Sequence, residues 1–346
     1  MSKILIVMIY GRQRLRVRKA AIEKFLHDYS LSEEEKEILL QRPIFENGND
    51  AFFVVLKRAS EIKERCSALM QDPYCMMTAT LELLETVSNE EESAYHRLFS
   101  WCQNECRLTG DKNYALDSGN LAFLRLRQGL QTLCIKESYF NHCITEFVNN
   151  RRNLLTLLLS ENLTQWSEHT NENNPNQLIS NIFTWIHEYL NEERTGIRLL
   201  FMKEMDDRIG GIMEKEGNHL VISCLDVIFS GANKFIQESL LPFFDKTSNL
   251  PQLFEAMQIM AFYDSIIGNT ISPSCSLNST LLSIEQTLWN SITNHLVIRV
   301  KHYFKLSPFI TNTFLASTAD IQNASLTKSN NVFTELLLLL KQCFEL

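Results

Sequence analysis

The sequence contains little glycine and little proline, with 11 and 7 of these residues in a chain of 346. These counts are about 3% and 2% of the chain, against roughly 7% and 5% in average proteins. Sheets and loops need both residues and long helices avoid them, so their scarcity favours a helical fold. The chain also lacks Gly-rich phosphate-binding loops, C-x-x-C pairs and any run near the roughly 18 apolar residues of a membrane span.

Cysteine and histidine do not combine into a recognisable metal site. Cys102 and Cys106 lie one helical turn apart, with His96 six residues before Cys102. A structural metal needs three or four convergent ligands, so we expect these cysteines to pack in the core, as free cysteines commonly do. The chain has nine cysteines, an odd number, which indicates reduced, buried thiols in a cytosolic protein.

Other reactive side chains also lack the context that catalysis needs. Glu204, Asp206 and Asp207 could do acid–base work or bind a cation, but no calcium-loop pattern surrounds them and a solvated face is favoured. The isolated histidines have no nucleophile context; they are His27, His142, His187, His295 and His302. The tryptophans occur in apolar stripes and are expected in the core; they are Trp101, Trp166, Trp185 and Trp289. We therefore expect no enzyme activity and no catalytic, cofactor-binding or metal-binding residue.

The charge is unevenly distributed. Residues 1–24 carry a net charge of +6, so the remainder carries −14, since the whole chain carries −8. The acidic total argues against nucleic-acid binding. The basic run consists of Arg12, Arg14, Arg16, Arg18 and Lys19. This run could contact anionic lipid, at about 1 kcal/mol per positive charge near the surface. A solvated helix end packed against partner helices is favoured, because the apolar residues between the arginines resemble a helix seam.

Residues 50–108 predict helix, breaker, helix, breaker, helix. The first helix has an apolar stripe at steps of three and four, formed by Phe52, Leu56, Ala59, Ile62, Cys66 and Leu69. Asp50 is its N-cap candidate, and Asp72-Pro73 ends it. The second helix contains Met76 to Leu84, and the third contains Tyr95 to Cys106.

Further helices are predicted along the rest of the chain. Ser32-x-x-Glu35 is a capping box that opens a short helix through Leu40, and Pro251 and Gly268 bracket another helix. Gly217-Asn218 is expected to interrupt a helix, and Pro242 to end one. The remaining predicted helices cover 14–26, 121–133, 139–166, 178–202, 219–241 and 279–304, followed by an irregular stretch over 308–331 and a short helix that closes at Leu346.

These patterns predict an all-α fold, an elongated rod of stacked antiparallel helical bundles. The expected divisions are a basic N-terminal helix over 1–30, a first bundle over 31–166, a polar linker over 167–176 and a second bundle region over 177–346. No self-similarity with the period of ankyrin, tetratricopeptide or HEAT repeats is visible.

Several segments, in order and at matching spacing, carry a resemblance to one family. They are Arg14 to Leu40, Phe52 to Met70, Glu92 to Arg107, Thr145 to Leu155, Asn174 to Asn191 and, less closely, Leu240 to Gly268. Together they resemble subunit 6 of the conserved oligomeric Golgi complex over about residues 12–305. Each segment alone is a generic amphipathic helix, and the ordered set is what is specific.

The resemblance implies a rod of helical bundles of the type shared by multisubunit tethering complexes. It implies a peripheral protein on the cytosolic face of the Golgi membrane, with other subunits and SNARE proteins as partners. It implies intra-Golgi retrograde vesicle tethering and Golgi organisation, with no nucleic acid, small-molecule substrate or cofactor. The alternatives are a subunit of another vesicle tether, of the exocyst-like or endoplasmic-reticulum type, and a generic helical adaptor.

The sequence departs from the family pattern at both ends. The family has a long coiled coil before the basic stretch, where this sequence has only Met1 to Gly11, and it continues past residue 346. We therefore expect a fragment or shortened form, incomplete at the C-terminus, with residues 1–30 as the end of a truncated coiled coil.

Overall fold

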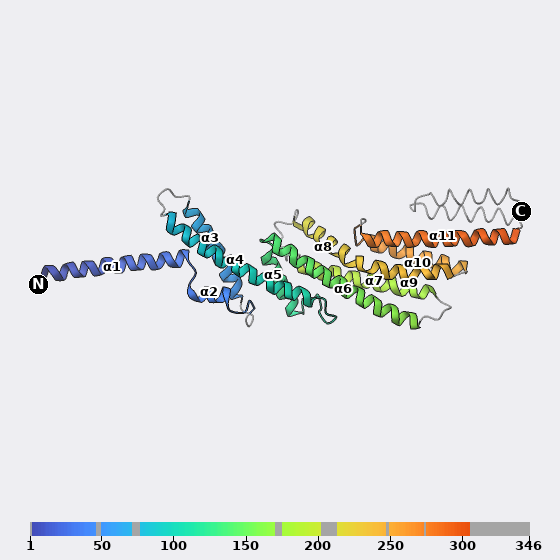
Figure 1. Ribbon diagram of the computed structural model, residues 1–346, viewed down its shortest axis with the longest axis horizontal. Coiled ribbons are helices and arrows are strands. Elements are labelled where there is room, and N and C mark those ends of the chain that lie inside the picture. The colour runs from blue at the N-terminus through green and yellow to red at the C-terminus, as the bar shows by residue number, and fades with distance from the viewer. Residues whose placement is uncertain are drawn as a thin grey trace. The chain divides into compact units, whose positions relative to one another are not determined.

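A computed structural model of the chain describes residues 2–45, 50–70, 77–169, 175–201, 213–246, 249–272 and 275–304. These residues form eleven α-helices and one 3-10 helix, and no strand occurs among them. The predicted all-α helical-bundle class is therefore confirmed (Figure 1). The helices are α1 (Ser2–Tyr29), α2 (Glu33–Leu40), α3 (Ala51–Leu69), α4 (Met77–Leu108), α5 (Leu121–Leu133), α6 (Glu137–His169), α7 (Pro175–Phe201), α8 (Met213–Phe229), η1 (Ser230–Ala232), α9 (Asn233–Lys246), α10 (Leu250–Gly268) and α11 (Ser276–Phe304).

The chain forms two compact units. Unit 1 comprises Met1–Asn150 with Leu199–Phe201, and unit 2 comprises Arg151–Arg198 with Met202–Leu346. Helix α6 ends at His169 and α7 begins at Pro175. The domain boundary predicted at the polar linker over 167–176 stays a prediction.

The core of unit 1 begins with the predicted stripe of α3. Phe52, Leu56, Ala59, Ile62 and Cys66 are all buried, because steps of three and four residues return them to one side of the helix. This side packs against α4, which packs in turn against α5. Full burial of a large apolar side chain contributes about 1.5–3 kcal/mol, so this stripe supplies much of the force that holds α3 in place.

Helix α4 corrects one prediction, because it runs unbroken where the sequence pattern predicts a second breaker. The stretch from Ser88 to Ser93 is polar but contains neither glycine nor proline, so nothing in it stops a helix. Glu91 in this stretch is 5% exposed, and its two carboxylate oxygens accept hydrogen bonds from Ser60 Oγ and Lys63 Nζ, each at 2.6 Å. The polar stretch is thus part of the α3–α4 interface.

The capping box at the start of α2 is confirmed. Ser32 Oγ accepts from the backbone N–H of Glu35 at 3.3 Å, and the Glu35 carboxylate accepts from the backbone N–H of Ser32 at 2.8 Å. The predicted N-cap of α3 is only half confirmed. Asp50 holds the N-cap position without a side-chain cap, and its Oδ1 instead accepts from Gln128 Nε2 at 3.1 Å.

We expect Ser32→Ala to lower the free energy of unfolding by about 1 kcal/mol, since it removes the acceptor for an otherwise unpaired N–H. Urea denaturation followed by circular dichroism measures this change. Ser93→Ala is the matched control, because the Ser93 hydroxyl only donates to the carbonyl of Asn89 within its own helix. Equal costs for the two variants would contradict a stabilising role for the capping box.

The core of unit 2 contains the predicted stripe of α7. Ile179, Ile182, Phe183, Ile186 and Leu190 are at most 1% exposed. Helices α10 and α11 lie side by side, and α11 also packs against α9 (Figure 1). Helix α10 has proline in its first turn and ends at Gly268, as predicted.

Two predicted breaks in unit 2 are wrong. Gly217-Asn218 lies inside α8, because one glycine costs a helix only about 1 kcal/mol and the buried side chains that follow repay this through packing. Pro242 lies inside α9, which continues to Lys246. The α-helical geometry is interrupted instead at the 3-10 helix η1, between α8 and α9. In η1, Gly231 packs closely on α6, since a Cβ added to it would lie 2.8 Å from Arg152 Cγ and 2.8 Å from Thr156 Cγ2. The irregular stretch over 308–331 and the closing helix at Leu346 lie outside the described residues.

Candidate functional site

The basic run lies on α1, whose side chains from residue 11 to residue 27 are all exposed. The apolar residues between the arginines are exposed as well, with Leu15 at 66% and Val17 at 65%. At its C-terminal end α1 is held by α3, because Arg58 donates to the His27 carbonyl at 2.8 Å and Arg65 to the Asp28 carbonyl at 3.2 Å. Within the described residues, the seam of α1 therefore faces no other helix of this chain.

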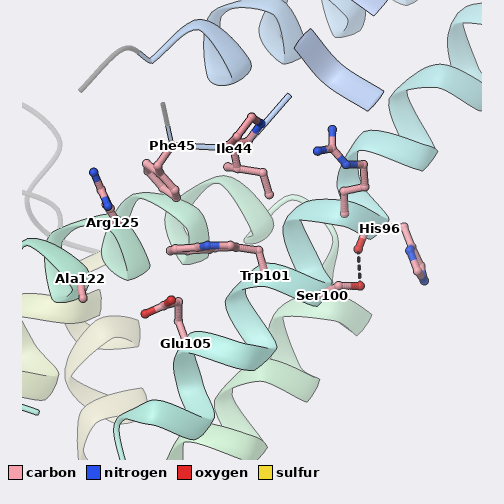
Figure 2. A pocket seen from close by; sticks show the side chains of 10 residues that line it. Ile44, Phe45, His96, Ser100, Trp101, Glu105, Ala122 and Arg125 are labelled. Carbon is pink, nitrogen blue, oxygen red and sulfur yellow. Dashed lines mark hydrogen bonds between the residues drawn. The ribbon is translucent and has the colours of Figure 1, made fainter. Parts of the chain in front are cut away.

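A pocket of about 480 Å³ lies between the segment after α2 and helices α4 and α5. Figure 2 shows the Phe45 ring close to the Trp101 indole, and the two ring centroids are 4.6 Å apart. Arg125 lies over the Phe45 ring, 5.6 Å from its centroid, and Glu105 lines the pocket from α4. Aromatic rings beside one cation and one anion can hold an apolar or aromatic group of a partner.

Arg97 fixes the segment that forms one wall of this pocket. It is half-buried on α4, and its guanidinium donates to the backbone carbonyls of Leu39 and, at 2.7 Å, of Arg42. Burial lowers the pKa of Arg97 from its ordinary value. These bonds hold the end of α2 and place Phe45 above Trp101.

The polar residues that line the pocket are not arranged as a catalytic group. The Ser100 hydroxyl donates to the backbone carbonyl of His96 at 3.0 Å, while the His96 ring points away from the pocket (Figure 2). Burial raises the pKa of the Glu105 carboxyl, and the charge of Arg125 opposes that rise. Glu105 and Ser100 therefore provide polarity and hydrogen bonding, without a nucleophile that is paired to a base.

A neighbouring polar cluster joins α4 to α6. Lys136 Nζ donates to Glu92 at 2.6 Å, and the Tyr139 hydroxyl donates to the same carboxylate at 2.9 Å. These two hydrogen bonds lower the pKa of Glu92. The Tyr139 ring stacks on Phe99 with centroids 4.8 Å apart. Glu92 is exposed and the other three side chains are half-buried, and the cluster holds the two helices together.

The cysteines that the sequence pattern singled out are buried, as predicted. Cys102 and Cys106 are 0% exposed and lie beside Cys143 of α6. Burial raises the pKa of Cys102, and a hydrogen bond with Cys143 followed by burial raises that of Cys106. Thiols with raised pKa values are poor nucleophiles. No group of three or more metal-ligating side chains in the described part of the chain could hold a metal ion.

The other predicted candidates do not meet at one place. Glu204, Asp206 and Asp207 lie outside the described residues, and His302 belongs to α11. His142 Nε2 pairs with Gln103 Nε2 at 3.2 Å, and His187 Nε2 with Asn191 Nδ2 at 3.0 Å. The tryptophans are half-buried and not fully in the core, which the apolar stripes did not predict; they are Trp101, Trp166, Trp185 and Trp289.

Three residues that build the pocket were not predicted from the sequence, namely Phe45, Glu105 and Arg125. They are far apart in the chain and belong to three different segments. The only local signal was the helix break at Gln41-Arg42-Pro43, which places a short non-helical segment next to the bundle. Nothing in the sequence indicated which helices that segment would meet.

One segment, Asn218–Pro242, is long and apolar enough to cross a membrane by length and composition alone, with a mean hydropathy of 1.3. The structure distributes this segment over α8, η1 and α9. Its buried side chains include Leu225, Ile228, Ile236 and Leu240, each 0% exposed within unit 2. In all, 39% of the most apolar window of this segment is buried, so length and composition alone are weak evidence for a membrane span.

The fold and these surfaces define a class of protein, the helical-bundle scaffold. The family profile described as "Conserved Oligomeric Golgi complex subunit 6, C-terminal" matches residues 77–335, which is well over half of the chain. The chain therefore belongs to the family of conserved oligomeric Golgi complex subunit 6, as the resemblance predicted.

Curated relatives that carry the name conserved oligomeric Golgi complex subunit 6 support this assignment. The Arabidopsis thaliana protein is 25% identical over 84% of this chain and 43% of the relative. The Drosophila melanogaster protein is 29% identical over 56% of this chain and 30% of the relative, and the Emericella nidulans protein is 22% identical over 82% and 40%. The chain thus spans less than half the length of these relatives. No solved structure matches.

Proposed function

We propose that this chain acts as a non-enzymatic subunit of the conserved oligomeric Golgi tethering complex. It takes part in intra-Golgi retrograde vesicle tethering and in Golgi organisation, as a peripheral protein on the cytosolic face of the Golgi membrane. Its partners are the other subunits of the complex and SNARE proteins. The observation that carries the proposal is the family match over residues 77–335, which extends through parts of both compact units.

The proposed mechanism is geometric. Each unit is a bundle whose buried stripes hold its helices in fixed positions, so surface side chains keep a constant arrangement. Partner helices dock on apolar and aromatic groups at the surface, since a few such groups usually supply most of the binding energy of an interface. The pocket with Phe45 and Trp101 is one such place on unit 1.

Co-purification tests the proposal. We expect an affinity-tagged form of the 346-residue chain, expressed in cells, to recover other subunits of the Golgi tethering complex. The control is the same chain with Leu98→Asp, because Leu98 is 0% exposed and a buried carboxylate there disrupts unit 1. The control should recover markedly less of those subunits.

Two outcomes would contradict the proposed function. One is recovery of no Golgi subunit by the folded wild-type chain. The other is selective recovery of subunits of a different tether, which would favour the exocyst-like or endoplasmic-reticulum alternative. Imaging of the tagged chain separates these cases, since the proposal requires a Golgi pattern.

A further inference from the structure

Helix α1 has an apolar stripe that no described helix covers. Leu15, Ile22 and Leu26 are 66%, 59% and 48% exposed. Their separations of seven and four residues are close to whole helical turns, so the three side chains lie on one side of the helix. Val17 is 65% exposed and lies on the opposite side by the same spacing rule.

Positive charges border this stripe on both sides. Arg14 and Arg18, four residues apart, run along one border, while Arg12 and Lys19 run along the other. Lys19 Nζ lies 3.6 Å from Glu23. No carboxylate of the described part of the chain lies within ion-pair distance of the other three side chains. Of the acidic residues of the helix, Glu23 follows Lys19 by four residues and lies on the same border, while Asp28 lies on the opposite side of the helix.

We propose that this surface of α1 binds an anionic lipid membrane, with the helix in the plane of the interface. Leu15, Ile22 and Leu26 enter the boundary between headgroups and acyl chains, and the bordering cations contact lipid phosphates. This inference locates the membrane contact of the proposed function, yet it can be tested without any Golgi partner.

The position of Arg18 favours a lipid surface over a helical protein partner. Arg18 lies four residues before Ile22 and three after Leu15, so it sits at the edge of the stripe itself. In a seam between two helices its charge would be buried and would need a partner carboxylate. At a membrane the long side chain extends to the phosphates while its methylene stem stays on the apolar surface. An anionic membrane presents negative charge on both sides of the inserted stripe, which matches the cations on its two borders.

Vesicle flotation tests this inference with the purified 346-residue chain. One set of vesicles contains phosphatidylcholine alone, and the other contains phosphatidylcholine and phosphatidylserine in a ratio of about 4 to 1. We expect the chain to float with the phosphatidylserine vesicles and to stay behind with the neutral ones. Binding should weaken as salt increases, since exposed charges are screened.

Paired substitutions on the same helix separate a specific surface from a general effect of charge. Arg12→Gln with Arg18→Gln removes one cation from each border of the stripe, and each such charge is worth roughly fivefold in binding. We therefore expect binding about 30-fold weaker. Arg16→Gln with Lys24→Gln removes the same charge from positions farther round the helix from the stripe, and it should weaken binding only a few-fold. All four side chains are exposed, so the fold should persist, as circular dichroism will show.

The apolar stripe has its own matched pair. Leu15→Ser should weaken vesicle binding roughly tenfold, because it removes a side chain that enters the lipid. Val17→Ser changes an equally exposed side chain on the opposite side and should leave binding nearly unchanged. Equal losses for the members of either pair would overturn the proposal, as would a wild-type chain that ignores phosphatidylserine. In the last case the surface of α1 is left to a protein partner, while the proposed function stands on co-purification.

Discussion

Glu193→Gln is expected to lower the free energy of unfolding by about 3–5 kcal/mol, because it removes the buried negative charge that accepts two hydrogen bonds from the buried Arg151 guanidinium. Arg151 and Glu193 join α6 to α7 in unit 2 and are 6% and 1% exposed. Arg151 Nε donates to Glu193 Oε1 at 2.8 Å, and its Nη2 donates to the same oxygen and, at 3.3 Å, to the Tyr189 hydroxyl. Burial, followed by the charge of Glu193, raises the pKa of Tyr189, so the phenol stays neutral.

Chemical denaturation of the 346-residue chain measures the loss in free energy of unfolding, and two further variants identify the cause of that loss. Arg151→Met with Glu193→Leu removes both charges and should recover most of the lost stability, since apolar replacements of buried ion pairs are often neutral or better. Glu238→Gln breaks the exposed pair with Lys234 and should cost well under about 1 kcal/mol. A double variant that is no more stable than Glu193→Gln would show that shape, and not charge, explains the loss.

Gly129→Ala is expected to destabilise unit 1 by about 1–3 kcal/mol, opposite in sign to the usual gain of such a change in a helix. Gly129 is buried in α5, where a Cβ would lie 2.6 Å from Cys102 Sγ and 3.3 Å from Trp101 Cζ3. Because Cys102 is itself 0% exposed, its sulfur has no free space to move into. The close contact between α4 and α5 therefore requires a residue without a side chain at position 129.

A compensating variant and a matched glycine test this explanation by thermal denaturation. Cys102→Ala with Gly129→Ala returns the lost space and should be more stable than Gly129→Ala alone. Gly268→Ala lies at the end of α10 with no heavy atom within 4 Å of the added Cβ, and it should be neutral or slightly stabilising. If Gly129→Ala were as well tolerated as Gly268→Ala, the close contact with Cys102 would not limit packing.

Local patterns predicted the parts of the fold that depend on one helix at a time. The buried stripes of α3 and α7 and the capping box at Ser32 follow from residues within a few turns of each other. The predicted helix breaks within α4, α8 and α9 were wrong, because contacts with other helices determine whether a helix continues there. The polar stretch from Ser88 to Ser93 continues α4 because Glu91 finds Ser60 and Lys63 on α3, which its own neighbours in sequence do not indicate.

The candidate sites divide in the same way. The charged and apolar residues of α1 could be identified from the sequence, because the spacing of residues along one helix fixes which of them share a side. Their exposure within this chain was not visible, and the favoured seam with partner helices stays a prediction. The pocket with Phe45, Trp101 and Arg125 could not be predicted, because it exists only where three distant segments meet.

The sequence by itself determined the helical class and the family, because both depend on residue spacing along the chain. Helical periodicity is a property of the backbone, and it places apolar side chains on one face whatever that face later contacts. The tertiary structure alone decided that Glu193 is buried against Arg151, that Gly129 is pressed on Cys102 and that the stripe of α1 is open. These facts depend on which helix faces come into contact, and contacts between residues distant in sequence are determined by how all the helices of a unit pack together.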